Sequence, residues 1–354
     1  MPWFGFLWSI ETMTEASERP TKRVTVVDVA RAAGVSPGTV SNAISGKRKV
    51  DHETQRRIQE AVETLGYRPN LAARRMRTGR TNTIAIYSSM PVAVAAGASK
   101  LGFLMEIAAS AAVAALEANM SLVLVPPVND PIATLKNISM DGIIVVEPEA
   151  DDPVLAMLQD VGVPTVSVGK PVGSPSAYVD LDYRLMAEFL FDHLRETGAE
   201  KFPLIVGASS RQSNLVFQEV YRRKAADIGM AAQVIALPEQ SAEDSAAAAI
   251  SKLLKEGAHF DAVLVPIDAM ATGVMHALKA QSVKIPDEVR VATRYDGVRA
   301  RTEVPPLTAI DLGLDIVAKT ATEVLIGIID DKGTVSVAGA PSPRVVPRAS
   351  SVSG

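Results

Sequence analysis

The sequence predicts two unlike folded parts. A small all-α domain with a helix-turn-helix lies near the N-terminus, and an α/β core of two doubly wound parallel-sheet subdomains follows it. Three short helical patterns separated by turns occur between Val24 and Gly66. From Thr83 onward, apolar strands alternate with helices in two successive series. Residues 21–80 hold thirteen basic and five acidic side chains, a net charge of +8, whereas the whole chain carries −4.

Composition limits the classes of protein to consider. The 354 residues suffice for two or three domains, and 47% hydrophobic with 21% charged residues is typical of globular chains. The absence of cysteine excludes a disulfide framework, a thiolate metal site and a cysteine nucleophile, and fits a reducing cytoplasm. A basic segment joined to an acidic remainder indicates a phosphate-binding module attached to a separate domain.

Residues 1–22 are expected to be a disordered leader or an incorrectly assigned start, with Met13 opening an ordinary polar segment. The apolar run from Pro2 to Ile10 is too short to span a bilayer and lacks the features of a signal peptide, so no membrane partner is expected. The alternative is an interfacial anchor formed by the aromatic side chains of that run, Trp3, Phe4, Phe6 and Trp8.

The first helix is predicted from VVDVARAAG. Its apolar residues recur at helical spacing, Asp28 lies where an acid favours a helix N-terminus, and Gly34 ends the helix. Ser36 is then the N-cap of a second helix, and Pro37 is tolerated at its first position because that N–H has no helical partner.

The second helix, PGTVSNAIS, is expected to turn Val40 and Ile44 inward and to leave a polar face outward. This is the layout of a helix-turn-helix, whose second helix enters a DNA major groove. The alternative is an αα-hairpin inside a larger helical domain. Asn42 is the best candidate base reader, because asparagine can bond adenine N6 and N7 together.

A third helix is predicted over His52–Leu65, with Ile58, Val62 and Leu65 as its core stripe and Gly66 as its end. Residues 67–70 are expected to be extended, because the residue before a proline avoids the helical region. These assignments give a helix-turn-helix domain over residues 23–68 and a hinge and linker over residues 69–81.

Three blocks carry a specific resemblance: TVVDVARAAGVSPGTVSNAISG, the V-x-x-x-T of VDHET, and LGYRPNLAARRMRTGRT. In their order and spacing they resemble the DNA-binding domain of the LacI-type (lactose-repressor/galactose-repressor) family. The resemblance implies that hydroxyls contact the DNA backbone at Thr25, Ser36, Thr39, Ser41 and Thr54. It also implies that bases are read at Pro37, Gly38 and Asn42, and it adds Tyr67 to the DNA-binding set.

The segment NLAARRMR resembles the family's hinge helix, which orders only when two protomers lie on an operator and which inserts an apolar wedge into the minor groove. Met76 occupies the wedge position, where leucine is usual, and Ala73 allows close approach. Asn70, Arg74 and Arg77 can reach phosphates. The alternative is a plain basic linker, because so short a helix is marginal alone.

The core alternates strands and helices, which implies parallel sheets covered on both faces. Strands are predicted within residues 83–89, 121–127, 141–148, 163–169, 202–209, 232–238, 262–268 and 289–297. Helices are predicted near residues 103–118, 182–197, 215–228, 245–256 and 269–279. By resemblance, residues 82–335 form an effector-binding and dimerisation domain that is similar to periplasmic sugar-binding proteins. The chain is expected to cross between its two subdomains near Asp180, Thr302 and Asp311.

Residues 336–354 are interpreted as a C-terminal tail. They contain no leucine heptads, so a homodimer rather than a tetramer is expected.

Ligands in open α/β sheets bind at the carboxyl ends of strands. The resemblance places effector-binding residues at Arg211, Ser213, Phe217, Asp268, Arg294 and Asp296. Phe217 replaces the family's usual arginine, Ile267 the usual asparagine before the aspartate, and Arg294 the usual glycine. Arginines hold vicinal hydroxyls or anions, so a sugar or small anion is expected, and Arg211 and Arg294 could grip a carboxylate or phosphate.

Two other classes of function are weighed. An enzyme would need a constellation that the sequence lacks: the 4 histidines, His52, His193, His259 and His276, form no H-E-x-x-H pair, and no G-x-S-x-G or P-loop occurs. No catalytic residue, metal or cofactor is therefore expected. A transport binding protein would need a signal peptide and no basic head.

The sequence thus favours a cytoplasmic, nucleoid-associated homodimeric transcriptional regulator, a repressor. Its partners would be double-stranded DNA with a pseudo-palindromic operator and a small-molecule effector. Whether that effector acts as inducer or corepressor stays open.

Overall fold

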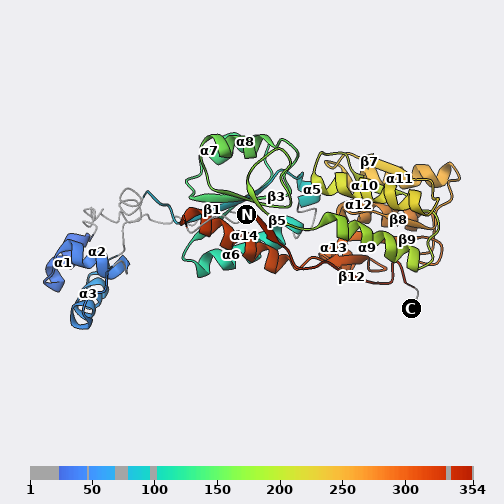
Figure 1. Ribbon diagram of the computed structural model, residues 1–354. Helices are drawn as coiled ribbons and strands as arrows, with labels where there is room; N and C mark the ends of the chain where they lie inside the picture. Colours follow the sequence, from blue (N-terminus) through green and yellow to red (C-terminus); the bar gives the residue numbers. More distant parts are fainter. Residues whose placement is uncertain (1–23, 46–47, 68–78, 96–101, 332–335, 353–354) are drawn as a thin grey trace, which may run out of the picture. The chain divides into compact units, whose positions relative to one another are not determined.

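The structure is a computed structural model that describes residues 24–45, 48–67, 79–95, 102–331 and 336–352. The chain forms two compact units, Met1–Gly79 and Arg80–Gly354, and each is described by itself (Figure 1). The leader at residues 1–22 and the hinge segment from Asn70 to Arg77 lie outside the described residues.

The first unit contains α1 (Val26–Ala33), α2 (Pro37–Ser45) and α3 (His52–Leu65), as the sequence predicts. Its core is formed by Val29, Ala30, Ala33, Val40, Ile58 and Ala61. Apolar side chains at helical spacing on three short helices thus meet in one small cluster.

Local hydrogen bonds fix the start of each of these helices. The Thr25 N–H donates to Asp28 Oδ2 (2.9 Å) at α1. The Thr39 N–H donates to Ser36 Oγ (3.1 Å) at α2, and the Thr54 N–H donates to Asp51 Oδ1 (2.9 Å) at α3. Such caps satisfy amides that have no helical partner. The hydrogen bond from the Thr54 amide also lowers the pKa of Asp51.

One inward-facing assignment in α2 is wrong. Val40 is fully buried, but Ile44 is 42% exposed and is absent from the residues that pack against the core of this unit. Val40 faces both neighbouring helices, whereas Ile44 lies one turn later, next to the last residue of α2.

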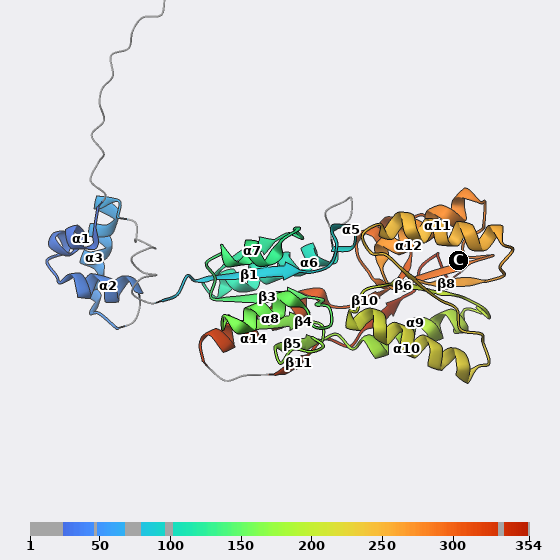
Figure 2. The ribbon, with the colours of Figure 1, turned by 90° about the horizontal axis from the view of Figure 1, so that it is seen from above.

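The second unit consists of two subdomains, each built on a six-stranded sheet (Figures 1 and 2). The first sheet has the order β11-β5-β4-β3-β1-β2 and is entirely parallel. Its strands are β1 (Thr83–Ser88), β2 (Ser121–Val125), β3 (Gly142–Val146), β4 (Thr165–Val168), β5 (Ala177–Asp180) and β11 (Val337–Gly339). The helices of this subdomain are α5 (Val92–Ala95), α6 (Phe103–Glu117), α7 (Pro131–Lys136), α8 (Pro153–Asp160) and α14 (Leu314–Ile329).

The second sheet has the order β12-β10-β9-β8-β6-β7 and is parallel except for β12, which runs antiparallel to β10. Its strands are β6 (Leu204–Gly207), β7 (Val234–Leu237), β8 (Ala262–Leu264), β9 (Arg290–Tyr295), β10 (Thr308–Asp311) and β12 (Arg344–Val346). Its helices are α9 (Tyr183–Glu196), α10 (Gln212–Asp227), α11 (Ala242–Lys255), α12 (Asp268–Ala280) and α13 (Val298–Thr302).

Both sheets are covered on both faces, which explains why their strands are almost continuously apolar. In β6, Leu204 and Val206 belong to the cluster that contains α9 and α10, whereas Ile205 belongs to the cluster with α11 and α12. Figure 2 shows these two helix pairs on opposite sides of the sheet. The prediction of two doubly wound parallel-sheet subdomains is confirmed.

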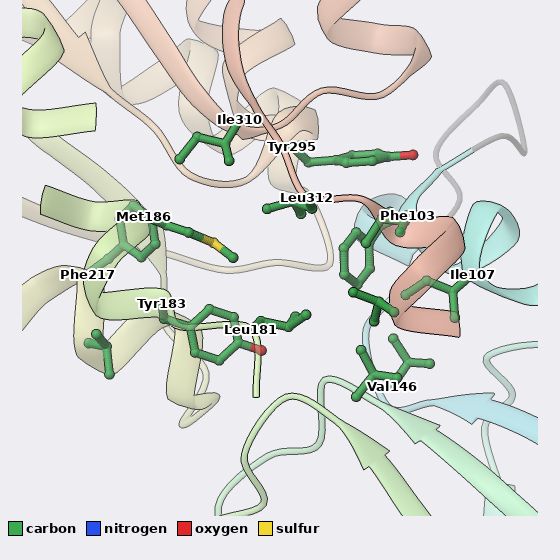
Figure 3. Packing of buried hydrophobic residues seen from close by; sticks show 14 of the residues in the cluster. Phe103, Ile107, Val146, Leu181, Tyr183, Met186, Phe217, Tyr295, Ile310 and Leu312 are labelled. Atoms are coloured by element: carbon green, nitrogen blue, oxygen red, sulfur yellow. The ribbon is translucent and has the colours of Figure 1, made fainter. Parts of the chain in front are cut away.

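The largest hydrophobic cluster is continuous between the two subdomains. Figure 3 shows Phe103 of α6 close to Leu312 in the connection after β10, and Val146 of β3 and Tyr295 of β9 belong to the same cluster. Phe103 and Tyr295 meet edge to face with their ring centroids 5.4 Å apart. The two halves therefore share part of one core.

The chain passes between the subdomains after β5, after β10, and between β11 and β12. The expected crossing near Thr302 is wrong, because α13 ends there and connects β9 to β10, neighbouring strands of one sheet. The third crossing lies at residues 340–343 instead. A crossover helix that returns the chain to the adjacent parallel strand is the usual connection within such a sheet.

The segment interpreted as a tail belongs to the fold. β11 extends the first sheet beside β5, β12 extends the second beside β10, and Ser350 and Ser351 are buried. Within the described parts of the chain, no helix has both the length and the apolar character that crossing a membrane requires.

Candidate functional site

A pocket lies where the carboxyl ends of strands from both sheets meet. It is lined by residues that follow or end their strands: Met90 after β1, Glu147 after β3, Arg211 after β6, Glu239 after β7, Ile267 after β8 and Arg294 in β9. Ser213 and Asn214, in the first turn of α10, complete its polar side. This is the place where open α/β sheets bind ligands.

Glu147 occupies the centre of this pocket and is only 2% exposed. Its Oε1 accepts hydrogen bonds from the Tyr183 hydroxyl (2.9 Å) and from Arg294 Nη1 (2.8 Å), and its Oε2 accepts one from Ser213 Oγ (2.7 Å). Glu147 belongs to the first subdomain and all three donors to the second. Burial and the neighbouring Glu147 carboxylate raise the pKa of Tyr183 well above its usual range, so Tyr183 remains a neutral donor.

Aromatic rings hold Arg294 in place. Its guanidinium carbon lies 5.6 Å from the centre of the Phe103 ring and 5.5 Å from that of Tyr183. Cation–π contacts of this kind stabilise a desolvated guanidinium and fix its plane. Phe103 and Tyr183 come from α6 and α9, so the arginine is held from both subdomains.

A second buried ion pair adjoins the first. Arg211 Nη1 pairs with Glu239, and Arg211 Nη2 lies 2.9 Å from Glu149 Oε1. Arg211 Nε donates to the backbone carbonyl of Glu147 (3.1 Å), and Asn214 Nδ2 donates to Glu239 Oε1 (2.8 Å). Because both arginines are matched by glutamates, the buried charges compensate one another, as charges taken out of water must.

Three of the six predicted effector residues, Arg211, Ser213 and Arg294, are brought together in this pocket. Asp268 is buried at the start of α12, directly after the pocket residue Ile267. Burial raises the pKa of Asp268, against the opposing effect of Arg299, whose Nε lies 3.9 Å away.

The remaining two predicted residues, Phe217 and Asp296, are not among the residues that line this pocket. Phe217 is fully buried in the hydrophobic cluster, because that face of α10 packs against the sheet. Asp296 pairs with Arg348 Nη1 (2.7 Å) and Arg301 Nη2 (3.3 Å). Burial acts to raise the pKa of Asp296, but these two arginines outweigh it and lower the pKa below its usual range.

Glu147, Asn214 and Glu239 are the polar pocket residues that sequence reasoning missed. Glu147 and Glu239 each follow a predicted strand, in IIVVEP and VIALPE, so the strand-end rule applied to every strand would have found both. In the described parts of the chain, no group of three or more acidic or histidine side chains is arranged to hold a metal ion.

The helix-turn-helix presents a mostly polar face on α2. Ser36, Pro37 and Gly38 are exposed, and Thr39, Ser41 and Asn42 are half-buried. The Thr25 hydroxyl donates to Asp28 Oδ2 (2.7 Å), and Tyr67 packs against the core of the unit.

Thr54 is less exposed than Thr25, Ser36, Thr39 and Ser41, the other hydroxyls expected at the DNA backbone. It is buried, and its Oγ1 accepts from Arg57 Nη2 (3.2 Å). Asn70, Ala73, Arg74, Met76 and Arg77 lie outside the described residues.

Comparison with known protein families gives two matches. Residues 25–70 match the family described as bacterial regulatory proteins, lacI family, and residues 191–351 match the periplasmic binding protein-like domain.

Similar proteins cover most of the chain. It is 29% identical over 334 residues to the HTH-type transcriptional regulator CelR of Thermobifida fusca, a match covering 89% of this chain and 95% of that protein. It is 27% identical over 299 residues to catabolite control protein A of Priestia megaterium, covering 81% and 87%.

Solved structures of transcriptional regulators are also similar to this chain. A transcriptional regulator CelR–cellobiose complex is 26% identical with a TM-score of 0.67, covering 93% of this chain and 100% of that one. A lac repressor dimer bound to operator and the anti-inducer ONPF is 21% identical with a TM-score of 0.78, covering 94% and 100%, and shows the fold alone. With its helix-turn-helix and its paired α/β subdomains, the chain therefore combines a DNA-binding region that matches the lacI family of bacterial regulatory proteins with a periplasmic binding protein-like domain.

Proposed function

We propose that this protein is a sequence-specific DNA-binding transcriptional regulator, a repressor, whose operator affinity is controlled by a small molecule bound in the pocket between the two α/β subdomains. The observation that carries the proposal is the presence, on one chain, of a helix-turn-helix with a polar recognition helix and of a polar pocket contacted by both subdomains. The net charge of +8 over residues 21–80 favours phosphate contact by the first of these.

The pocket supports a sugar or small anion as effector. Its charged and amide groups, with Met90, Val94 and Ile267 as apolar neighbours, suit a small polar molecule with an apolar face. The similar CelR structure contains cellobiose, which favours a sugar-like ligand here. A ligand that binds one arrangement of the subdomains better than another shifts their equilibrium, and operator affinity changes by the same coupling.

The proposed DNA complex contains two protomers. Two copies of α2 would read the half-sites of a pseudo-palindrome in successive major grooves. The segment from Asn70 to Arg77, with Met76 as the wedge, would contact the minor groove between them. The lac repressor dimer on operator, which shares the fold, makes a homodimer the natural arrangement.

We further infer that the pocket binds without catalysing. Its two arginines are paired with glutamates. The Ser213 hydroxyl donates a hydrogen bond to the Glu147 carboxylate and does not face a histidine that could act as its base. The protein would act in the cytoplasm, on the DNA of the nucleoid.

Fluorescence anisotropy at fixed salt tests the proposal. Labelled operator candidates selected from the source genome are titrated with the protein, without and with sugars, sugar acids, sugar phosphates and nucleobases. Tight, sequence-selective binding that one of these compounds changes is expected. Weak, salt-sensitive and sequence-blind binding would overturn the proposal, because phosphate contacts alone give that behaviour.

Asn42 offers a residue-level test, with Ser41 as its control. Asn42→Ala is expected to lose discrimination of about 1–3 kcal/mol at one base pair per half-site, because asparagine reads adenine through two hydrogen bonds. Ser41→Ala, at a proposed backbone contact, is expected to weaken all sequences alike. Anisotropy against operators with single base-pair changes separates these patterns. A uniform loss for Asn42→Ala would make Asn42 a backbone contact.

A further inference from the structure

The carboxylate of Glu147 is held as a bound ligand would be. Tyr183, Ser213 and Arg294 converge on its two oxygens from the second subdomain at 2.7–2.9 Å. The three donors fit the two oxygens of one carboxylate, and the single positive charge of Arg294 balances its negative charge. Charge-assisted hydrogen bonds of this length are stronger than those between neutral groups. The pocket around them has room for about one water molecule.

The three donors are fixed independently of Glu147. Arg294 lies over the rings of Phe103 and Tyr183. The Tyr183 hydroxyl occupies the space above Gly169, whose φ is +90° and where an added Cβ would overlap the hydroxyl oxygen. Ser213 lies in the first turn of α10, a 16-residue helix. These three donors therefore form a receptor for a carboxylate, which contacts from both subdomains hold in place.

Glu147 itself has an unfavourable backbone conformation. It adopts a left-handed backbone conformation with φ of 51°, which is uncommon for a residue other than glycine. It lies directly after β3, and its side chain accepts the hydrogen bonds of all three donors from the side of the first subdomain. Moving this one side chain would free the receptor.

The charge balance selects the class of molecule that can take its place. A neutral ligand that displaced Glu147 would leave Arg294 buried without a counter-charge, which is costly. A molecule with a carboxylate replaces it charge for charge. A phosphate dianion would exceed the one available cation, because Arg211 is already paired with Glu239 and Glu149.

We propose that Glu147 is an internal ligand, and that the effector is a small carboxylate-bearing molecule whose carboxylate displaces it from Tyr183, Ser213 and Arg294. The proposal rests on the proposed function insofar as it takes this pocket for the effector site. It goes further by naming the effector's charged group and the residue with which that group competes.

Exchange with acetate tests the receptor directly. In the full-length Glu147→Ala variant, acetate at ten times its dissociation constant is expected to raise the melting temperature by roughly 3–6 °C. Acetamide, its neutral isostere, is expected to have no effect at the same concentration and ionic strength. Wild-type protein, in which Glu147 fills the receptor, should not respond to acetate. Glu219→Ala, which removes a carboxylate from an exposed pair with Arg184, should not respond either.

The double variant Glu147→Ala/Arg294→Ala removes the receptor and should also lose the response to acetate. Equal shifts with acetate and acetamide, or a shift that survives loss of Arg294, would overturn the proposal.

A second measurement uses unmodified protein and holds even where Glu147→Ala does not fold. Calorimetric titration of wild-type protein compares D-glucuronate with D-glucose, a pair that differs at the carboxylate. At least tenfold tighter binding of the acid is expected, and Arg294→Met should abolish the difference. Equal or tighter binding of glucose would overturn the proposal.

The outcome for operator binding is separate. Selective operator binding without preference for acids would remove this inference and keep the regulator. Loss of selective operator binding with an intact acetate response would remove the proposed regulator and keep the carboxylate receptor.

Discussion

Arg211 and Glu239 illustrate how this protein keeps charge inside its second unit. Both side chains are almost fully buried, and each has further hydrogen-bonding partners, Ser209 for the arginine and Asn214 for the glutamate. A buried pair of this kind is expensive to break but contributes little relative to well-packed apolar residues. The position of this ion pair next to the pocket therefore favours a role in ligand recognition over a role in stability.

Glu239→Gln tests the cost of breaking this pair. The substitution keeps the shape but removes the buried counter-charge of Arg211 and places an N–H opposite its guanidinium. A loss of about 2 kcal/mol in the stability of the second unit is expected. Glu219→Gln, in an exposed pair 2.8 Å from Arg184 Nη2, should cost less than about 1 kcal/mol. Differential scanning calorimetry compares both with wild type, and equal losses would contradict the argument.

Single residues also show where sequence reasoning about the pocket succeeded. Arg294 was identified because it departs from a family position, and Arg211 because it follows a strand. The strand-end rule could have found Glu147 but not its three partners, because they lie 36, 66 and 147 residues away in the sequence. Only the folded arrangement of two sheets brings those strand ends together.

Phe217 shows a different limit of sequence reasoning. An aligned position gives no information on which way a helix faces, and this face of α10, with Val216, Val220 and Tyr221, is turned into the core.

Elements were most predictable where their signals are local. Helices α1 and α3 of the first unit begin at caps and end at Gly34 and Gly66, and these signals can be read within a few residues. β11 and β12 have three residues each and lie in a segment rich in proline, glycine and serine. Their pairing with β5 and β10 is decided by tertiary contacts, which no local pattern records.

The contact between α11 and α12 gives an element-scale prediction. A Cβ added at Gly273 would overlap the carbonyl oxygen of Glu243 and lie 3.1 Å from the Ala247 nitrogen, both in the α11 backbone. Gly273→Ala should force the helices apart and cost roughly 1–3 kcal/mol. Gly327 in α14 has nothing within 4 Å of such a Cβ, so Gly327→Ala should stabilise by roughly 0.4–1 kcal/mol. Calorimetric melting of both variants should give shifts of opposite sign, and shifts of one sign would refute the proposed helix contact.

At the scale of the whole second unit, the end of the chain ties the subdomains together. After β11 in the first sheet the chain returns to β12 in the second and then buries Ser350 and Ser351. Ser350 Oγ donates to the Val291 carbonyl (2.6 Å) and accepts from the Thr308 N–H (2.8 Å). These bonds hold the last described residues against β9 and β10, so truncation before β12 would remove an integral edge of the fold.

His193 in α9 makes this attachment sensitive to pH. Its Nε2 lies 2.7 Å from Ser351 Oγ, and burial lowers its pKa below the ordinary value of 6.5, against a weaker opposing effect of Glu196. The unfolded chain therefore binds a proton more readily than the folded one. The stability that His193 contributes is present above pH 6.5 and is lost as the pH falls through its lower folded pKa.

The melting temperature of wild-type protein should consequently fall between pH 7.5 and 5.5. His193→Gln retains a polar group near Ser351 but cannot titrate, and its melting temperature should fall less over the same interval. Scanning calorimetry at pH 7.5, 6.5 and 5.5 measures both slopes, and the difference isolates His193 from every other titrating group. Parallel slopes would mean that protonation of His193 is tolerated in the fold and that the other contacts of this segment hold it against β9 and β10.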